Sequence, residues 1–251
     1  MTEAMDAEFD TVAEWTAEVA IDLGPDYYVP AGCRGSGSPA ALDWLIDRMD
    51  LSPGQSLLDS GAGVGGPADH AAQRRSVLPL LVEPEAGACR AAQRLFDHPV
   101  VQASGSRLPF PDESVDAAWC LGVLCTTPDK GALLSELRRV VRPAGAIGLL
   151  VFVATDVLPA DTPDGNQFPT AGLLTDLAGT TGLDIETWQG ATGLDPPSRE
   201  WQDREQTVTE RLEECYGDER AWQVAEDQSR RMGTLVSEGH VSGELLVLRR
   251  P

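Results

Sequence analysis

The sequence predicts an α/β fold: an open, mainly parallel sheet covered by helices on both faces. Through the middle of the chain, short apolar runs alternate with amphipathic helical stretches. Such alternation is typical of a parallel sheet whose strands are connected by helices. A glycine-rich turn at residues 59–66 joins one apolar run to a helix. Open sheets of this class bind ligands at the carboxyl ends of their strands, so the turn marks the expected site.

The composition fits one α/β domain with insertions or a small cap. The chain has 251 residues and a hydrophobic content of 42%, which suffices for a core of ordinary size. No apolar run reaches the roughly 18 residues that would indicate a membrane span, so no membrane partner is expected. The N-terminal residues lack a basic segment followed by an apolar one, and we therefore expect a cytoplasmic protein.

The formal net charge of −21 disfavours nucleic acid as a partner, because a phosphate backbone would be repelled. Solubility explains such a charge, and a preference for a cationic or amine substrate is the alternative. The five cysteines form no Cys-x-x-Cys pair, and the three histidines are scattered. These residues indicate neither a disulfide framework nor a metal site.

The N-terminal residues are expected to form two helices, at 7–23 and 40–49, with a turn-rich stretch at 24–39 between them. The first helix has an apolar face made of Phe9, Val12, Ala13, Val19 and Ala20. In the centre, the apolar runs and helical stretches alternate along the chain. Strands are expected at 56–59, 80–83, 100–103, 115–121 and 147–154, and helices at 68–75, 86–96 and 130–141.

The C-terminal third combines strands with a helical insertion. A loop rich in Pro, Asp and Gly runs to residue 169, and a helix at 170–180 and a strand at 185–188 follow. Two polar helices, at 198–216 and 219–237, precede a last strand at 244–249. This insertion, together with the N-terminal helices, predicts a cap over the carboxyl edge of the sheet.

The strongest motif is the turn itself, Leu-Leu-Asp-Ser-Gly-Ala-Gly-Val-Gly-Gly at residues 57–66. Gly61 and Gly63 allow the backbone to turn sharply and to approach a ligand without an intervening Cβ. The helix that follows offers free N–H groups and a positive dipole end. The same glycines also satisfy the dinucleotide pattern G-x-G-x-x-G. Asp59, directly before them, would repel a pyrophosphate and favour a cation, as in the ammonium and sulfonium of S-adenosylmethionine.

Around this motif the chain resembles the class I S-adenosylmethionine-dependent methyltransferases. Their pattern is a strand, an acid-x-Gly-x-Gly turn, a helix, a strand ending in an acid, and a Leu-Pro-Phe turn. Residues 108–116, Leu-Pro-Phe-Pro-Asp-Glu-Ser-Val-Asp, look like the segment before the family's fourth strand. Residues 137–145 look like the helix and turn before its fifth strand. The resemblance is continuous over residues 55–153.

The resemblance implies a Rossmann-like, doubly wound sheet of seven strands with an antiparallel last strand. It also implies a helical cap built from the N-terminus and a late insertion. Residues 1–50 are expected to form N-terminal helices and a lid. Residues 51–251 are expected to form the S-adenosylmethionine-binding domain, with the cap insertion at about 195–239.

The resemblance further implies cofactor contacts. Glu83 ends the second strand, where a carboxylate binds ribose hydroxyls, and Pro84 is expected against the adenine. Ser104 replaces an Asp that usually contacts the adenine amine, and its hydroxyl can still accept that hydrogen bond. Arg34 is expected either to pair with the cofactor carboxylate or to be a surface arginine. The expected cofactor-binding residues are Asp59, Gly61, Ala62, Gly63, Gly65, Glu83, Pro84, Ser104, Gly105, Ser106, Cys120, Leu121 and Arg34.

No catalytic residue is assigned from the sequence. Cys125 stands where the family commonly has a Glu-His pair beside the methyl group, and a buried thiol is the expected role of Cys125. His70 and Tyr28 are the candidates, with structural packing as the alternative for both. The aromatic residues of the cap either line a substrate pocket or pack the cap on the sheet; they are Trp201, Tyr216 and Trp222.

The expected reaction is transfer of the methyl group of S-adenosylmethionine to an O, N, S or C nucleophile of a small metabolite. The protein then needs chiefly to align the nucleophile and exclude water. By analogy with capped members of the family, secondary metabolism is a plausible setting. The alternatives are a non-methylating relative that binds the cofactor as a scaffold or rearrangement catalyst, and an NAD-dependent oxidoreductase, which Asp59 disfavours. The acceptor stays open, as does the choice between monomer and homodimer.

Overall fold

The computed structural model describes residues 7–251, so residues 1–6 of the expected lid lie outside the described part of the chain. Residues 7–251 contain a seven-stranded sheet in the order β3-β2-β1-β4-β5-β7-β6. The first five strands pair in parallel, and β7 runs antiparallel to both β5 and β6. The expected doubly wound sheet with an antiparallel last strand is confirmed. The strands are β1 (Ser56–Ser60), β2 (Leu78–Glu83), β3 (Val100–Gln102), β4 (Ala117–Leu121), β5 (Ala146–Ala154), β6 (Asp184–Gly190) and β7 (Val241–Arg249).

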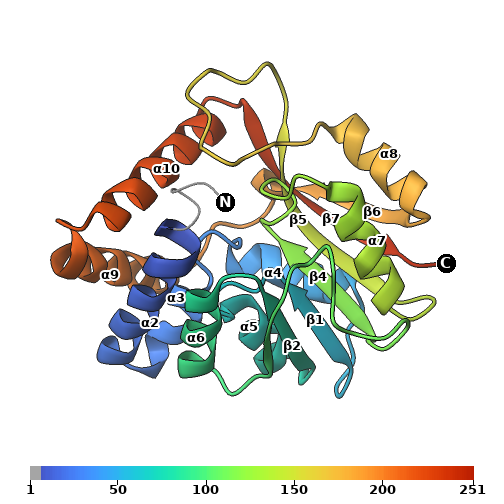
Figure 1. Ribbon diagram of the computed structural model, residues 1–251, viewed down its shortest axis with the longest axis horizontal. Helices are drawn as coiled ribbons and strands as arrows, with labels where there is room; N and C mark the ends of the chain where they lie inside the picture. Colours follow the sequence, from blue (N-terminus) through green and yellow to red (C-terminus); the bar gives the residue numbers. More distant parts are fainter. Residues whose placement is uncertain (1–6) are drawn as a thin grey trace.

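Helices precede these strands and connect several of them (Figure 1). The N-terminal ones are η1 (Ala7–Thr11), α2 (Val12–Leu23), η2 (Pro25–Tyr27), α3 (Tyr28–Gly32) and α4 (Pro39–Arg48). The connecting helices are α5 (Gly66–Arg75), α6 (Ala86–Leu95), α7 (Lys130–Val140) and α8 (Ala171–Thr181). The late insertion consists of η3 (Ala191–Gly193), α9 (Arg199–Tyr216) and α10 (Arg220–Ser237). None of the helices in residues 7–251 is long and apolar enough to cross a membrane.

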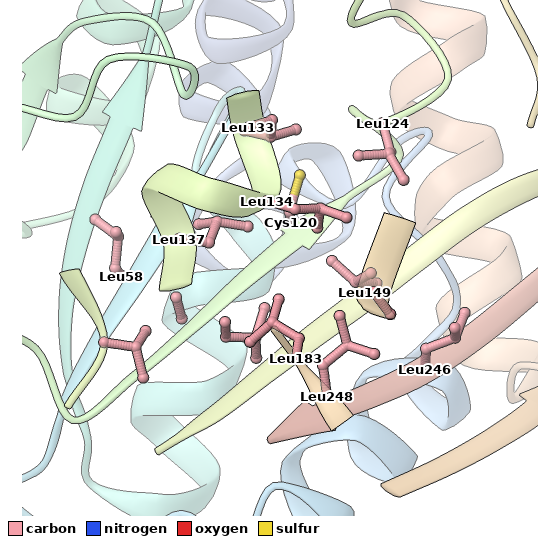
Figure 2. Close-up of a cluster of buried hydrophobic side chains, with 14 of the residues drawn as sticks. Leu58, Cys120, Leu124, Leu133, Leu134, Leu137, Leu149, Leu183, Leu246 and Leu248 are labelled. Atoms are coloured by element: carbon pink, nitrogen blue, oxygen red, sulfur yellow. The ribbon is translucent and has the colours of Figure 1, made fainter. Parts of the chain in front are cut away.

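Each face of the sheet carries its own hydrophobic layer. Figure 2 shows Leu133, Leu134 and Leu137 of α7 against leucines of the neighbouring strands, such as Leu149. On the opposite face, α4 packs its buried side chains against Trp119 of β4. Each fully buried Leu or Ile side chain stabilises the fold by about 1.5–3 kcal/mol. Because the central strands are buried on both sides, they read as continuous apolar runs in the sequence.

The N-terminal helices and the late insertion pack on one another. Val12 and Val19 of α2 share a hydrophobic cluster with Leu212 of α9, Trp222 of α10 and Leu95 of α6. Figure 1 shows α2, α3, α9 and α10 gathered at one end of the molecule, with α8 at the other. Segments almost 200 residues apart in the sequence therefore form one helical layer beside α6.

Two local expectations at the N-terminus were wrong. Phe9, expected on a buried face, is 37% exposed. The described part of the chain begins with the π-helical turn η1, whose i→i+5 hydrogen bonds break the 3.6-residue period on which that expectation depends. The stretch at 24–39, expected as turns, contains η2 and the short helix α3. The backbone of α3 lies directly on the start of α5, because Gly32 and Gly66 both lack a Cβ.

Candidate functional site

The glycine-rich turn leaves β1 at the carboxyl edge of the sheet. Gly61 and Gly63 both adopt left-handed backbone angles, with φ of +80° and +52°. A Cβ at Gly61 would overlap the side chain of Val123, so this glycine permits the turn to pack on the loop after β4. A Cβ at Gly63 would meet no atom within 4 Å. Gly63 therefore borders open space in which a ligand can approach the backbone.

Glu83, at the end of β2, bridges to this turn. Its Oε2 accepts a hydrogen bond of 2.8 Å from the Gly63 N–H, and its Oε1 accepts one of 3.0 Å from the Glu85 N–H. Burial raises the pKa of the Glu83 carboxyl to about 7, although the two N–H donors oppose the rise. The carboxylate expected at the ribose thus lies beside the turn that the sequence marked as the cofactor site.

Asp59 is a buried carboxyl without a full set of partners. Its Oδ2 has no hydrogen-bond partner within residues 7–251, and only 1% of the residue is exposed. Burial raises its pKa to about 7; the nearby indole of Trp119 opposes the rise without forming a close hydrogen bond, and the charge of Glu83 adds to it. A buried carboxylate of this kind is costly unless it is compensated, so a cation at this edge would stabilise it.

The loop after β3 reaches the same edge. Gly105 lies so close to β1 that a Cβ there would be 2.6 Å from both Ser60 Oγ and Leu133 Cδ1. The Ser106 N–H donates to Ser104 Oγ at 3.3 Å, which orders the loop. Residues expected to contact the adenine are therefore brought beside the glycine-rich turn, as a ligand spanning both would require.

The end of β4 completes this edge. Cys120 and Leu121 are buried in the strand, and Gly122 follows with a φ of +79°. The Gly122 carbonyl accepts a hydrogen bond of 3.0 Å from the Cys125 thiol. Burial raises the pKa of Cys125 to about 11, so it is a protonated thiol at neutral pH and a poor nucleophile.

Arg34 belongs to a turn at residues 33–37 that covers the end of β4. The carbonyl oxygen of Gly35 lies 3.2 Å from the position of a Cβ on Gly122. The Arg34 side chain extends toward the cap, where its Nη2 is 3.9 Å from Glu226 Oε1. Its guanidinium carbon lies 5.7 Å from the centre of the Trp222 ring. The residue is thus beside the site, with its charge directed at α10.

The two catalytic candidates have structural partners. His70 Nε2 lies 2.8 Å from Asp43 Oδ1, which ties α5 to α4. Tyr28 packs edge-on against Phe96, with ring centres 6.4 Å apart. A catalytic role for either residue stays a prediction without support from these contacts.

The cap aromatic residues also make packing contacts. Tyr216 stacks on Trp15 of α2 at 4.3 Å between ring centres. Trp222 is buried in the cluster that joins the cap to α2, and Trp201 packs against the cluster on the sheet that contains Trp119 and Leu150. These contacts attach α9 and α10 to the N-terminal helices and to the sheet.

Sequence reasoning missed three carboxylates, those of Glu8, Glu205 and Glu226, which act electrostatically on Arg34. They lie on η1, α9 and α10. Burial raises the pKa of Glu8 to about 7, with Arg34 opposing the rise. The cap contains many acids, and no sequence spacing distinguishes these three, because only the packing of η1, α9 and α10 around Arg34 brings them together.

The buried carboxyls predict a pH-dependent stability. The pKa values of Asp59 and Glu83, about 7 when folded, exceed the values near 4 of the unfolded chain. The folded state therefore binds these two protons more tightly than the unfolded chain does. Their contribution to the free energy of unfolding is present at low pH and is lost as the pH rises through about 7. Without added ligand, the free energy of unfolding should fall by about 1–3 kcal/mol between about pH 6 and about pH 8.

Urea denaturation at the two pH values measures this difference. The Asp59→Asn, Glu83→Gln double variant is the control, because it removes these two carboxyls and retains the three histidines and Glu8, whose pKa is also raised to about 7. Its free energy of unfolding should change less over the same range. An equal pH dependence in the double variant would show that these carboxyls do not titrate near pH 7.

Comparisons with known proteins agree with this geometry. Residues 58–149 match the family model of the methyltransferase domain. The chain is similar to a sterol 24-C-methyltransferase of Gibberella zeae, with 31% identity over 125 residues that cover 47% of this chain and 33% of the relative. Its fold is similar to the cyclopropane synthase MmaA2 of Mycobacterium tuberculosis, with a TM-score of 0.72, 16% identity and coverage of 94% and 98% of the two chains. It is also similar to the [4+2]-cyclase SpnF, with a TM-score of 0.69, 20% identity and coverage of 86% and 84%.

In this central segment the chain is similar to the class I S-adenosylmethionine-dependent methyltransferases, which are enzymes that use S-adenosylmethionine as cofactor, and its fold is similar to theirs. It spans between a third and a half of the length of the first curated relatives that it matches. The residues at the carboxyl edge fit this cofactor. Gly63 leaves room for its approach, Asp59 offers an unpartnered carboxylate to a cation, and Glu83 lies at the turn where ribose is expected.

Glu83→Ala is expected to weaken S-adenosylhomocysteine binding by about 10- to 100-fold, since a hydrogen bond to a charged group contributes about 1.5–3 kcal/mol. The substitution also removes the partner of the Gly63 N–H. Isothermal titration calorimetry measures the affinity. Glu83→Gln is the matched comparison, because it keeps an oxygen for that N–H and should lose less affinity. Unchanged affinity in the alanine variant would mean that Glu83 does not contact the ligand.

Proposed function

We propose that this protein transfers the methyl group of S-adenosylmethionine to a nucleophile of a small-molecule acceptor. The observation that supports this most strongly is the glycine-rich turn. Gly63, at a φ of +52°, faces open space and donates its N–H to the Glu83 carboxylate; Asp59 Oδ2, at the start of the same turn, has no hydrogen-bond partner within residues 7–251. A cationic, ribose-containing ligand matches this combination of groups better than a dinucleotide, whose pyrophosphate Asp59 would repel.

The residues of the chain bind, orient and shield rather than supply a strong base. The bound cofactor supplies an activated methyl group. Glu83 and the 104–106 loop orient the adenosine part, and Asp59 favours the cationic part. η1 packs on α10, and α10 packs on β7; we infer that this layer shields the bound cofactor from water, which would strengthen these electrostatic contacts. Alignment of the acceptor then accounts for most of the rate.

The acceptor is proposed to be a small metabolite that enters between the cap and the carboxyl edge. A sterol is the acceptor class named for the Gibberella zeae relative, which makes apolar metabolites the first class to test. Phe152, near the end of β5, and Trp201 of α9 are both partly buried against the hydrophobic cluster on this face of the sheet. Secondary metabolism is the setting that we propose for such a reaction.

A second function is favoured by two observations. The fold is as similar to a [4+2]-cyclase as to many methyltransferases, and Cys125 stands where the family often has an acid and an imidazole. A chain that uses the cofactor as a scaffold for a rearrangement would release a product isomeric with its substrate. No S-adenosylhomocysteine would form.

Turnover separates the two functions. The purified chain is incubated with S-adenosylmethionine and a panel of sterols, phenols, amines and polyketide-like alcohols, and products are followed by mass spectrometry. Methyl transfer predicts equal amounts of S-adenosylhomocysteine and of a product heavier by one methylene group. An isomeric product without S-adenosylhomocysteine would contradict methyl transfer and support the rearrangement.

A further inference from the structure

Arg34 lies between the carboxyl edge of the sheet and the cap. Its single positive charge is surrounded by three carboxyl groups. Its backbone belongs to the turn that covers Gly122 at the end of β4. The carboxylates of Glu8, Glu205 and Glu226 approach its guanidinium from η1, α9 and α10. One cation thus faces three acids that belong to three separate helices of the outer layer.

The contact between Arg34 and the cap is a loose one. Its ion pair with Glu226 measures 3.9 Å, which is at the outer limit for such a pair. Within residues 7–251, no carboxylate lies within hydrogen-bond distance of this guanidinium. The guanidinium carbon also lies 5.7 Å from the centre of the Trp222 ring. The donors of the guanidinium fork are therefore available to a better acceptor, and a carboxylate that binds both arms of the fork forms a stronger pair.

Arg34 lies close to the place where the carboxylate of the cofactor, a better acceptor, is expected. The turn at 33–37 lies over the end of β4, where the amino-acid part of the cofactor is expected and carries a carboxylate. A change of side-chain rotamer turns a long arginine from one side of its own backbone to the other. Glu226 and the cofactor carboxylate therefore compete for one guanidinium.

We propose that Arg34 exchanges partners, from Glu226 of α10 to the carboxylate of the cofactor, and that this exchange loosens α10 before the acceptor enters. The proposal rests on cofactor binding as described under the proposed function. It makes Glu226 a competitor of the cofactor and α10 the part of the cap that responds to binding. It predicts an ordered reaction, in which the cofactor binds before the acceptor.

If Glu226 and the cofactor carboxylate compete for Arg34, substitutions of Glu226 and of Arg34 should change the affinity for S-adenosylhomocysteine in opposite directions. Glu226→Gln keeps the shape of the side chain and removes its charge, so it should tighten S-adenosylhomocysteine binding by about 2- to 5-fold, the range for a solvent-accessible ion pair. Arg34→Gln should weaken binding by about 10-fold or more, because it removes a charged hydrogen-bond donor. Calorimetry with S-adenosylhomocysteine as the probe measures both.

Glu219→Gln is the matched control for the charge change. Glu219 is an exposed residue at the start of the same helix, and it makes no side-chain cap hydrogen bond. Its substitution alters the net charge of the protein by the same amount. The affinity for S-adenosylhomocysteine should therefore remain that of the unsubstituted chain, and circular dichroism confirms that each variant is folded.

Hydrogen exchange of α10 gives an independent measurement. In the unsubstituted chain, amides of residues 220–237 should exchange faster when S-adenosylhomocysteine is added. In Glu226→Gln they should exchange faster from the start and respond little to the addition. A merely structural role of Glu226 would loosen α10 in this variant without increasing its affinity for S-adenosylhomocysteine.

Two results would overturn the exchange: an unchanged or weaker affinity in Glu226→Gln, or greater protection of α10 on addition of S-adenosylhomocysteine to the unsubstituted chain. Absence of any binding to the unsubstituted chain is a different result. It would contradict the proposed function itself, and the exchange with it. The calorimetric titration of the unsubstituted chain therefore comes first.

Discussion

Gly63→Val is expected to abolish measurable S-adenosylhomocysteine binding while the sheet remains folded. A side chain at this position extends into the open space beside Glu83, where no protein atom lies within 4 Å. The added branches would occupy the path of the ligand to the backbone of the turn. The φ of +52° also costs a β-branched residue about 1–2 kcal/mol. A domain stability of about 5–15 kcal/mol tolerates that cost.

Calorimetry measures the loss of binding, and circular dichroism measures the fold. Gly54→Val is the matched control: Gly54 has a φ of +82° and no atom within 4 Å of an added Cβ, and it precedes β1 at the opposite edge of the sheet. The control carries similar backbone strain and should bind normally. A folded Gly63→Val variant with normal affinity would show that the turn is not the cofactor site.

Gly66→Ala should detach the N-terminal segment from α5 and lower both stability and cofactor affinity. An added Cβ would overlap the carbonyl carbon of Gly32 and lie 2.7 Å from the backbone nitrogen of Cys33. Backbone atoms cannot avoid the clash by a change of rotamer, so α3 must move. Overpacking of this kind costs about 1–3 kcal/mol. The displaced turn takes Arg34 away from the end of β4.

Urea denaturation measures the stability, and hydrogen exchange over residues 28–37 reports whether α3 has separated. Gly179→Ala is the control, because Gly179 lies in α8 and an added Cβ there meets nothing within 4 Å. That variant should be as stable as the unsubstituted chain or gain up to about 1 kcal/mol, since alanine favours a helix over glycine. If the Gly66→Ala variant is as stable as the unsubstituted chain and its α3 amides stay protected from exchange, the backbone contact between Gly32 and Gly66 is not what keeps α3 packed on α5.

The sheet and its connecting helices are predictable from the sequence because their signals are local. Buried parallel strands appear as short apolar runs, and α7 shows its face at Leu133, Leu134 and Leu137. The glycine-rich turn is equally local, since Gly61 and Gly63 both need positive φ within a few residues of β1. The motif therefore identified the edge of the sheet at which the site residues come together.

The contacts between distant segments were not predictable. The 3.6-residue pattern gave no indication of η1, which exposes Phe9. The acids around Arg34 carry no distinguishing spacing, because the packing of η1, α9 and α10 alone selects them. The sequence placed Arg34 near the cofactor, and only the structure shows its side chain turned toward Glu226. The contacts within the cap thus depend on long-range packing, whereas the turn at the sheet edge depends on a local motif.

One measurement tests the central claim most directly: calorimetric titration of the purified chain with S-adenosylmethionine, S-adenosylhomocysteine and NAD. The unpartnered Asp59 carboxylate, the open space at Gly63 and the Glu83 carboxylate predict that both S-adenosyl compounds bind at one site and that NAD shows no appreciable binding. Binding of NAD in preference to S-adenosylmethionine would contradict the account.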